Sequence, residues 1–100
     1  MTQFKDLDPL LHSQLRLAIV SLLMGVESAE FTYLREKTGA TAGNLSIQIT
    51  KLKEAGYIEV SKGFSKNYPQ TICRITDPGR KRFAEYVNAL TEYLKPDQKG

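Results

Sequence analysis

Cysteine and histidine are nearly absent from this 100-residue sequence, which contains one of each, Cys73 and His12. A single cysteine excludes a disulfide within the chain and also excludes the cysteine-rich sites that hold structural zinc. His12 has no cysteine or second histidine at the spacing of a metal ligand. We therefore expect neither a metal nor another cofactor. Cys73 lies between Ile72 and Ile75, and we interpret it as a buried, inert thiol.

Long hydrophobic runs are also missing. The longest apolar stretch covers residues 17–26 and is interrupted by Ser21 and Gly25. A membrane-spanning helix needs about 20 apolar residues. The first residues also lack the charged and then apolar layout of a signal peptide. We therefore predict a cytoplasmic protein.

The residue sets that catalysis requires do not occur either. There is no Ser/His/Asp arrangement, no pair of carboxylates in a suitable context and no glycine-rich loop for phosphate. We therefore do not expect an enzyme. The composition, 41% hydrophobic and 25% charged residues, is that of an ordinary folded protein. A chain of this length fits one small domain, and we predict a single domain over residues 1–100.

Positive charge collects in the middle of the chain. Residues 31–76 contain seven basic and three acidic side chains, a net charge of +4, whereas residues 1–30 carry −2 and residues 77–100 carry +1. A basic segment of this kind is typical of a protein that binds a polyanion. The same net charge is also compatible with solvated lysines that are scattered over the surface and bind nothing.

Capping residues and apolar spacing predict three helices in the first half of the chain. Asp8 as N-cap and Pro9 at the first helical position begin a helix over residues 8–25. A short helix over residues 32–38 is expected to start at Thr32 and to end at Gly39. A third helix over residues 42–55 follows, with Thr41 as its cap.

A β-hairpin and a last helix are predicted for the second half. The hairpin covers residues 57–76, with a loop of turn-forming residues at 63–69 between its strands. The last helix, residues 78–95, is capped by Thr76 or Asp77. This order, α-α-α-β-β-α with room for a short first strand, predicts a mainly α fold with a small β-hairpin wing, the winged helix-turn-helix. In such a fold the second helix of the helix-turn-helix fits the major groove of B-DNA.

The third predicted helix has one apolar face and one polar face. Leu45, Ile49 and Leu52 have the spacing of a buried stripe. On the other face Asn44 suits bases or phosphates, and Ile47 suits a thymine methyl group. The residues of this helix and its cap that we predict to contact DNA are Thr41, Gly43, Asn44, Ser46, Ile47, Thr50 and Lys51, with Lys53 as a further phosphate contact.

The predicted wing adds a second polar and basic surface. Its members are Lys62, Ser65, Lys66 and Asn67. Side chains of these types bind the phosphate backbone or enter the minor groove. The sequence therefore predicts one helix and one hairpin tip as the two parts of a DNA site.

Two passages carry a family resemblance. Residues Ile49 to Ile58 have the form I-x-x-L-x-x-A-G-Y-I, and residues Thr76 to Arg80 have the form T-x-x-G-R. With residues 31–34, 38–41 and 44–46, they resemble the winged-helix transcriptional regulators of the MarR/ArsR type. The resemblance extends over residues 8–95. It implies a dimeric, sequence-specific DNA-binding repressor or activator of compact, single-domain form.

The same resemblance implies roles for individual residues. Asn44, Ser46, Ile47, Thr50 and Lys51 would contact DNA from the recognition helix, and residues 62–67 would form the wing. The sequence lacks the clustered cysteine and histidine ligands of ArsR-type metal sensors. It also lacks the added helices that build the usual MarR dimer.

Two helices have more apolar surface than a small monomer needs. The first has a second apolar stripe, so it is either sandwiched in the core or in contact with another chain. The last helix has an unusually wide stripe. We predict a two-fold homodimer on a palindromic DNA site, with helices that pack through Leu10, Leu17, Val20, Met24, Phe83, Tyr86, Val87, Leu90, Tyr93 and Leu94.

A different function is compatible with the same fold. Some winged helices serve only as protein–protein interaction modules, because a fold does not determine a function. Such a module does not require lysines and small residues on the second helix of the helix-turn-helix. Lys51, Lys53 and the Gly43–Asn44 start of the helix therefore favour DNA.

Overall fold

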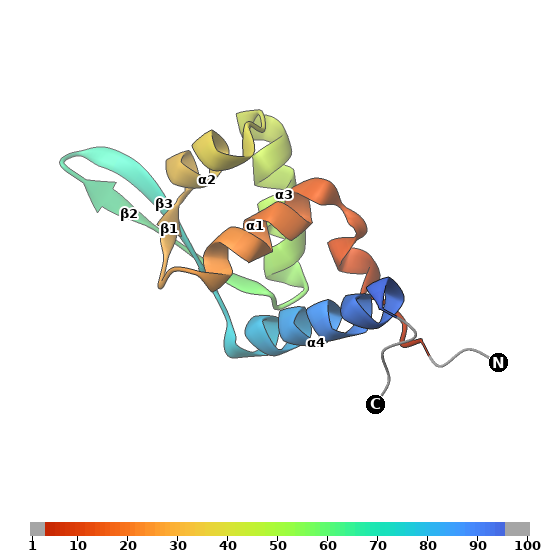
Figure 1. The fold of residues 1–100 in the computed structure, drawn as a ribbon. Helices are drawn as coiled ribbons and strands as arrows, with labels where there is room; N and C mark the ends of the chain where they lie inside the picture. The colour runs from red at the N-terminus through yellow and green to blue at the C-terminus, as the bar shows by residue number, and fades with distance from the viewer. Residues whose placement is uncertain (1–3, 96–100) are drawn as a thin grey trace.

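The computed structural model describes residues 4–95, in which three helices and a three-stranded sheet surround the core and a fourth helix runs along one side (Figure 1). The elements are a short 3-10 helix η1 (Pro9–His12), α1 (Gln14–Met24), β1 (Ala29–Glu30), α2 (Phe31–Thr38), α3 (Ala42–Glu54), β2 (Ile58–Ser65), β3 (Tyr68–Ile75) and α4 (Asp77–Leu94). The strands form one antiparallel sheet in the order β1-β3-β2. The predicted winged helix-turn-helix fold is confirmed, including the short first strand.

The N-terminal helix is not continuous, so the predicted single helix over residues 8–25 is wrong. Asp8 caps η1 by accepting a hydrogen bond from the Leu10 N–H at 3.0 Å. Ser13 then has extended backbone angles (φ −90°, ψ 127°) and caps α1 by accepting from the Arg16 N–H at 3.2 Å. A serine that caps a new helix gives up its own helical conformation, which explains the break.

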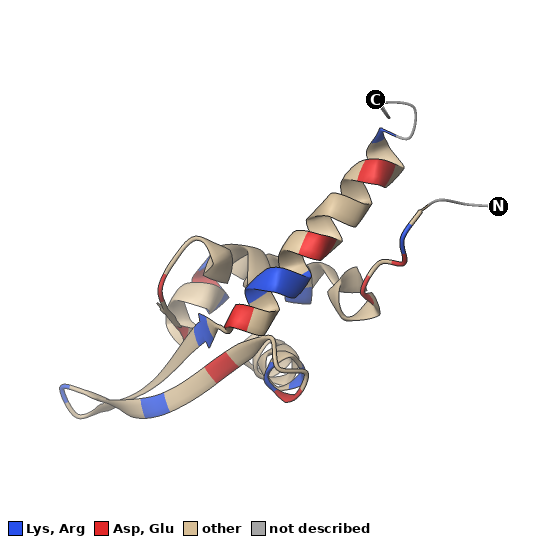
Figure 2. Ribbon diagram, turned by 90° about the horizontal axis from the view of Figure 1, so that it is seen from below, with Lys and Arg blue, Asp and Glu red and all other residues tan. Residues whose placement is uncertain are grey.

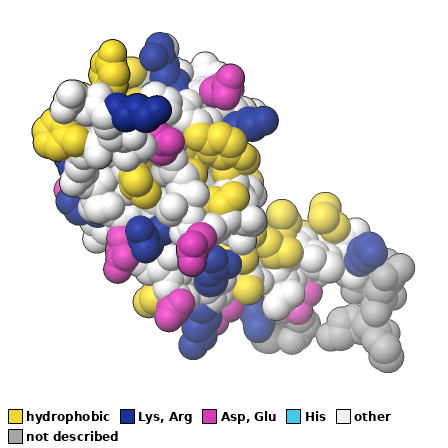
Figure 3. Space-filling view, turned by 90° about the vertical axis from the view of Figure 1, so that its left-hand side faces the viewer, with side chains coloured by type: hydrophobic (Ala, Val, Ile, Leu, Met, Phe, Trp, Pro, Cys, Tyr) yellow, Lys and Arg dark blue, Asp and Glu magenta, His cyan; other side chains and the backbone are white. Residues whose placement is uncertain are grey.

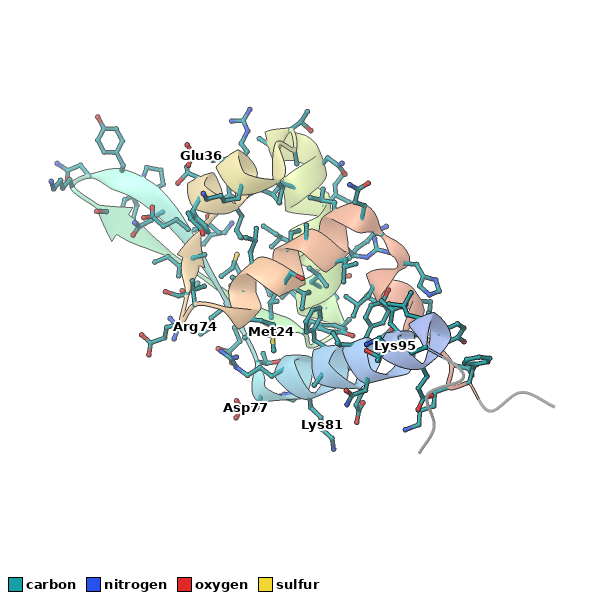
Figure 4. All side chains as sticks on the ribbon, in the orientation of Figure 1. Met24, Glu36, Arg74, Asp77, Lys81 and Lys95 are labelled. Atoms are coloured by element: carbon teal, nitrogen blue, oxygen red, sulfur yellow. The ribbon has the colours of Figure 1, made fainter. Side chains whose placement is uncertain are left out.

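Helix α1 buries a side chain that the sequence analysis assigned to a partner chain. Val20 is fully buried within its own chain together with Ile19 and Leu23. The prediction that Val20 is on a surface for a partner chain is therefore wrong, and here the helix is sandwiched in the core. Met24 is half-buried, and its side chain points toward α4 (Figure 4).

The helix-turn-helix forms through its caps. Gly39 ends α2 in the left-handed conformation (φ 72°), which glycine adopts without strain. Thr41 caps α3, as predicted, by accepting from the Asn44 N–H at 3.1 Å. The predicted cap at Thr32 is wrong, because β1 runs directly into α2 and the helix already starts at Phe31.

The two strands of the wing extend further toward the turn than predicted. Lys66 (φ 52°) and Asn67 (φ 71°) form a two-residue turn, and pairing continues through Ser65–Tyr68 and Phe64–Pro69. The predicted loop over residues 63–69 is therefore wrong. Two successive positive φ angles give the turn the twist that matches its strands. Pro69 is tolerated in β3 because β1 pairs only with Ile72 and Cys73 and does not reach it.

The side chain of Tyr57 joins three distant parts of the chain. Tyr57 follows α3 and is fully buried, and its hydroxyl donates a hydrogen bond to the Asp8 carboxylate. The Arg82 guanidinium of α4 binds the same carboxylate at 2.9 Å, donates to the Ala55 carbonyl at 2.9 Å and lies 4.2 Å from the centre of the Tyr57 ring. The start of η1, the end of α3 and the first turns of α4 therefore meet at one side chain.

The backbone of Tyr57 fixes the start of α4. Its carbonyl oxygen accepts from the Thr76 N–H at 3.0 Å and from the Thr76 hydroxyl at 3.1 Å. Thr76 also caps α4 by accepting from the Gly79 N–H at 2.9 Å. A Cβ atom on Gly79 would lie only 2.2 Å from the Tyr57 oxygen, so the helix approaches this closely only with glycine there. The T-x-x-G passage is therefore a packing requirement.

Helix α4 has buried, half-buried and exposed apolar side chains. Tyr86 and Ala89 are buried in the core, so the prediction of Tyr86 as a contact for a partner chain is wrong. Phe83 and Leu90 are half-buried, whereas Val87 (42% exposed), Tyr93 and Leu94 (72% exposed) remain on the surface. Tyr86 belongs to the buried core cluster of its own chain, which helical spacing alone does not indicate.

We expect Gly79→Ala to destabilise the protein by at least about 2 kcal/mol, because the added methyl group collides with the Tyr57 backbone. Gly43→Ala is the matched control, since Gly43 is also in the first turn of a helix and no atom lies within 4 Å of its added Cβ. We expect Gly43→Ala to be neutral or slightly stabilising. Urea unfolding followed by circular dichroism measures both, and equal stability of the two variants would contradict the packing argument.

The Asp8 carboxylate makes stability depend on pH. Burial raises its pKa, but the hydrogen bonds from Tyr57 and Leu10 and the contacts with Arg82 outweigh this, so the pKa is below 3.8. A carboxylate whose pKa is lowered by folding stabilises the protein above its unfolded pKa and loses that contribution as pH falls through the folded pKa. We expect Asp8→Asn to destabilise at pH 7, and the difference from the wild type to shrink between about pH 5 and pH 2.

Tyr57→Phe provides the companion measurement. It removes one hydrogen bond that lowers the pKa of Asp8, so we expect a loss of about 1–2 kcal/mol at pH 7 and a smaller loss in acid. Urea unfolding at pH 7, 5 and 3 gives the free energies. If the difference in free energy of unfolding between wild type and Asp8→Asn stays constant over this pH range, folding does not lower the pKa of Asp8.

Candidate nucleic-acid interface

The polar face of α3 is exposed and continuous. Leu45, Ile49 and Leu52 are buried, as their spacing predicted. Ile47 is 55% exposed, so its apolar side chain is available to a ligand on this face. The remaining predicted contact residues of this face, all exposed, are Thr41, Gly43, Asn44, Ser46, Thr50, Lys51 and Lys53. The structure therefore brings these residues together on one helix surface.

The start of α3 is tied to α1 by polar contacts that the sequence analysis missed. The side-chain amide of Gln48 donates to the Asn44 side-chain oxygen at 3.0 Å. The Gln48 oxygen accepts from the Arg16 guanidinium at 2.6 Å, and Arg16 Nε donates to the Leu10 carbonyl at 2.7 Å. The signals available in the sequence were the i, i+4 spacing of Asn44 and Gln48 and the single basic residue within the apolar first helix.

The wing carries the second group of predicted residues. Lys62, Ser65, Lys66 and Asn67 are all exposed, with Lys66 and Asn67 in the turn itself. Figure 2 shows basic positions at the tip and along the hairpin. The hairpin projects away from the helices, so the structure separates the wing tip from the exposed face of α3 (Figure 1). A ligand that touches both must be extended, as duplex DNA is.

The wing also has exposed aromatic side chains that the sequence analysis gave no role. Phe64 is 78% exposed and Tyr68 is 74% exposed. They lie on opposite faces of the ribbon, because Phe64 pairs with Pro69 and Tyr68 pairs with Ser65. Their exposure followed from the length of the strands, since a hairpin that extends beyond the core exposes both of its faces.

A second surface lies at the far end of α4. Hydrophobic side chains gather on the arm that projects toward the termini (Figure 3). Its exposed apolar residues are Val87, Tyr93 and Leu94. Phe4 stacks on Tyr93 with ring centroids 4.6 Å apart, and the Tyr93 hydroxyl donates to the Lys5 carbonyl at 3.0 Å. The predicted Leu10, Leu17 and Met24 are half-buried and pack against the core of their own chain.

Within residues 4–95 no group of three or more histidine, cysteine or acidic side chains could hold a metal ion. Cys73 is buried, and burial raises the pKa of its thiol to about 11, so it is protonated at neutral pH. No helix among these residues is long and apolar enough to cross a membrane.

Solved structures share this arrangement of helices and wing. The transcriptional regulator homologue protein from Pyrococcus horikoshii matches with a TM-score of 0.82 and 24% identity, over 90% of this chain and 89% of that one. A mutant MarR protein from Escherichia coli, complexed with operator DNA, matches with a TM-score of 0.72 and 14% identity, over 86% of this chain and 61% of that one. At these identities the likeness shows a common fold.

Sequence comparison gives the family. An uncharacterized protein of Methanocaldococcus jannaschii is 39% identical over 84 residues, which are 84% of this chain and 91% of that protein. The profile of the family described as the winged helix DNA-binding domain matches residues 15–94, from α1 to the end of α4. Since the match includes the helix-turn-helix, the wing and the last helix, this protein belongs to the winged helix DNA-binding domain family.

Proposed function

We propose that the protein is a homodimeric transcriptional regulator that binds specific sequences of double-stranded DNA. In this proposal α3 enters the major groove, and the wing lies on the phosphate backbone or in the minor groove. The observation that carries the proposal is the exposed face of α3, where small, hydrogen-bonding and basic residues surround the exposed Ile47. Such a face combines close approach to base edges with neutralisation of phosphates.

The order of residues on α3 fits this orientation. Gly43 and Asn44 are in the first turn, where a recognition helix comes nearest to the bases. Lys51 and Lys53 are in the last turn. Base contacts at one end of the helix and phosphate contacts at the other are consistent with a helix that enters the groove by its N-terminus.

Known relatives support the same assignment. The Pyrococcus horikoshii structure is described as a transcriptional regulator homologue, and the Escherichia coli MarR structure contains operator DNA. We assign DNA binding to this chain because it matches the family and because the polar face of α3 is exposed.

The projecting end of α4 supports a dimer. Val87, Tyr93 and Leu94 are exposed beside the half-buried Leu90. Large apolar side chains that cluster on a surface usually mark an interface. A two-fold pair of α4 helices would cover them and would set two recognition helices about 34–36 Å apart on a palindromic site. Of the residues predicted from sequence, the proposed interface keeps Val87, Leu90, Tyr93 and Leu94. It omits the buried Val20 and Tyr86 and also Leu10, Leu17, Met24 and Phe83, which pack against the core of their own chain.

We expect binding to duplex DNA to weaken steeply as salt rises, because lysines on α3 and the wing release counterions from phosphates. Lys66→Ala should reduce the slope of log K against log salt by about one. Lys81→Ala is the control, because Lys81 is exposed on α4 and points away from α3 and the wing (Figure 4). Fluorescence anisotropy with a random duplex measures the slopes. Absence of duplex binding at low salt would favour a protein–protein module instead.

We expect the double substitution Val87→Glu and Leu94→Glu to give a folded monomer that binds DNA far more weakly. Both side chains are exposed within one chain, so the charges leave the core intact while opposing a second α4. Lys81→Glu, also an exposed change on α4, should remain dimeric. Sedimentation equilibrium at micromolar concentration gives the masses. A wild-type protein that sediments as a monomer would refute the dimer and the palindromic site together.

A further inference from the structure

We propose that Arg16 and Gln48 orient the side chain of Asn44, so that its amide presents N–H donors to DNA and selects guanine. The inference rests on the DNA-binding function proposed above. Arg16 and Gln48 are positioning residues in this proposal, and Asn44 is the residue that touches the base.

Three hydrogen bonds form a relay from the N-terminal segment to the surface of α3. Arg16 Nε donates to the Leu10 carbonyl at 2.7 Å, which fixes the guanidinium at the junction of η1 and α1. Arg16 also donates to the Gln48 oxygen at 2.6 Å. Gln48 in turn donates to the Asn44 side-chain oxygen at 3.0 Å. The relay ends at an exposed residue in the first turn of the recognition helix.

The direction of this relay is set by chemistry. A guanidinium group has only donors, so the group of Gln48 that faces Arg16 must be its oxygen. The nitrogen of Gln48 is then turned toward Asn44, which must meet it with its own oxygen. The amide nitrogen of Asn44, with two N–H donors, is left to face outward. An asparagine without these neighbours presents a donor and an acceptor equally well.

A surface that offers donors distinguishes the base edges of the major groove. Guanine presents two acceptors, N7 and O6, whereas cytosine presents only its N4 donor. Adenine pairs best with an asparagine that supplies both its oxygen and its nitrogen, and here the oxygen is turned toward Gln48, from which it accepts a hydrogen bond. Asn44 is therefore expected to prefer guanine, to accept adenine or thymine less well and to reject cytosine.

Gln48→Glu tests the relay with almost no change of shape. A carboxylate has only acceptors, so it still accepts from Arg16 but now requires a donor from Asn44. The Asn44 amide must then turn over and present its oxygen. We expect the preferred base to change from guanine to cytosine or adenine, whose amino groups are donors, by at least about fivefold in relative affinity. Asn44→Asp, which also presents acceptors, should select the same bases.

The measurement is selection of bound duplexes from a random-sequence library, followed by competition binding with duplexes that differ at one base pair. The full chain is used at low salt, and circular dichroism checks that each variant is folded. The added negative charge of Gln48→Glu is controlled in the Asn44→Ala background. There the charge should weaken binding to all duplexes equally and leave the base preference unchanged.

Arg16→Met provides a second variant. Loss of the guanidinium frees the Gln48 amide to turn either way, so Asn44 can present a donor or an acceptor to the base. We therefore expect the preference for guanine over adenine and over cytosine to become smaller. If Gln48→Glu and Arg16→Met both bind DNA with the wild-type base preference, the relay proposal is overturned and the DNA-binding function stands. If the wild-type chain binds no duplex at low salt, the proposed function and the relay are both overturned.

Discussion

The contact between Tyr57 and Asp8 holds the two ends of the domain together. One buried phenol ring lies under the Arg82 guanidinium, its hydroxyl binds the carboxylate that caps η1, and its own backbone carbonyl receives the start of α4. Because Tyr57 also directly follows α3 and precedes β2, it sets how the recognition helix, the wing and α4 leave the core. The position of α4, and with it the proposed dimer surface, depends on this residue and on the close approach of Gly79.

A similar connection links the N-terminal segment to the recognition helix. The break at Ser13 that separates η1 from α1 leaves the Leu10 carbonyl free of a helical partner at the place where Arg16 binds it. Arg16 then reaches α3 through Gln48. An apparent irregularity of the first helix thus supports the side chain at the start of the proposed DNA-reading face. The same N-terminal segment therefore contacts both α3 and α4.

The two proposed interfaces differ in how they are stabilised. The face of α3 is fixed by buried Leu45, Ile49 and Leu52 beneath it, so its polar side chains are presented by a rigid element. The wing is a two-stranded ribbon that extends beyond the core. The end of α4 also projects from the core, in a different direction (Figure 2). These three elements suit a regulator that binds DNA as a dimer: α3 would contact the bases, the wing would contact the DNA backbone, and a second chain would cover the apolar end of α4.

Local chemistry was sufficient to predict the order of elements and the polar face of α3. The caps at Asp8, Thr41 and Thr76 and the left-handed Gly39 act over a few residues, so the sequence by itself determined where η1, α3 and α4 begin and where α2 ends. The cap at Ser13 and the start of α2 at Phe31 were missed. Only the tertiary structure decided the burial of Val20 and Tyr86, because a helical wheel shows which residues share a face but not what packs against it. The same holds for Arg16 and Gln48, which meet because α1 packs on α3, and for the junction of Asp8, Tyr57 and Arg82. Contacts between residues 49 or 74 positions apart depend on how whole elements pack, and local spacing carries no information about that packing.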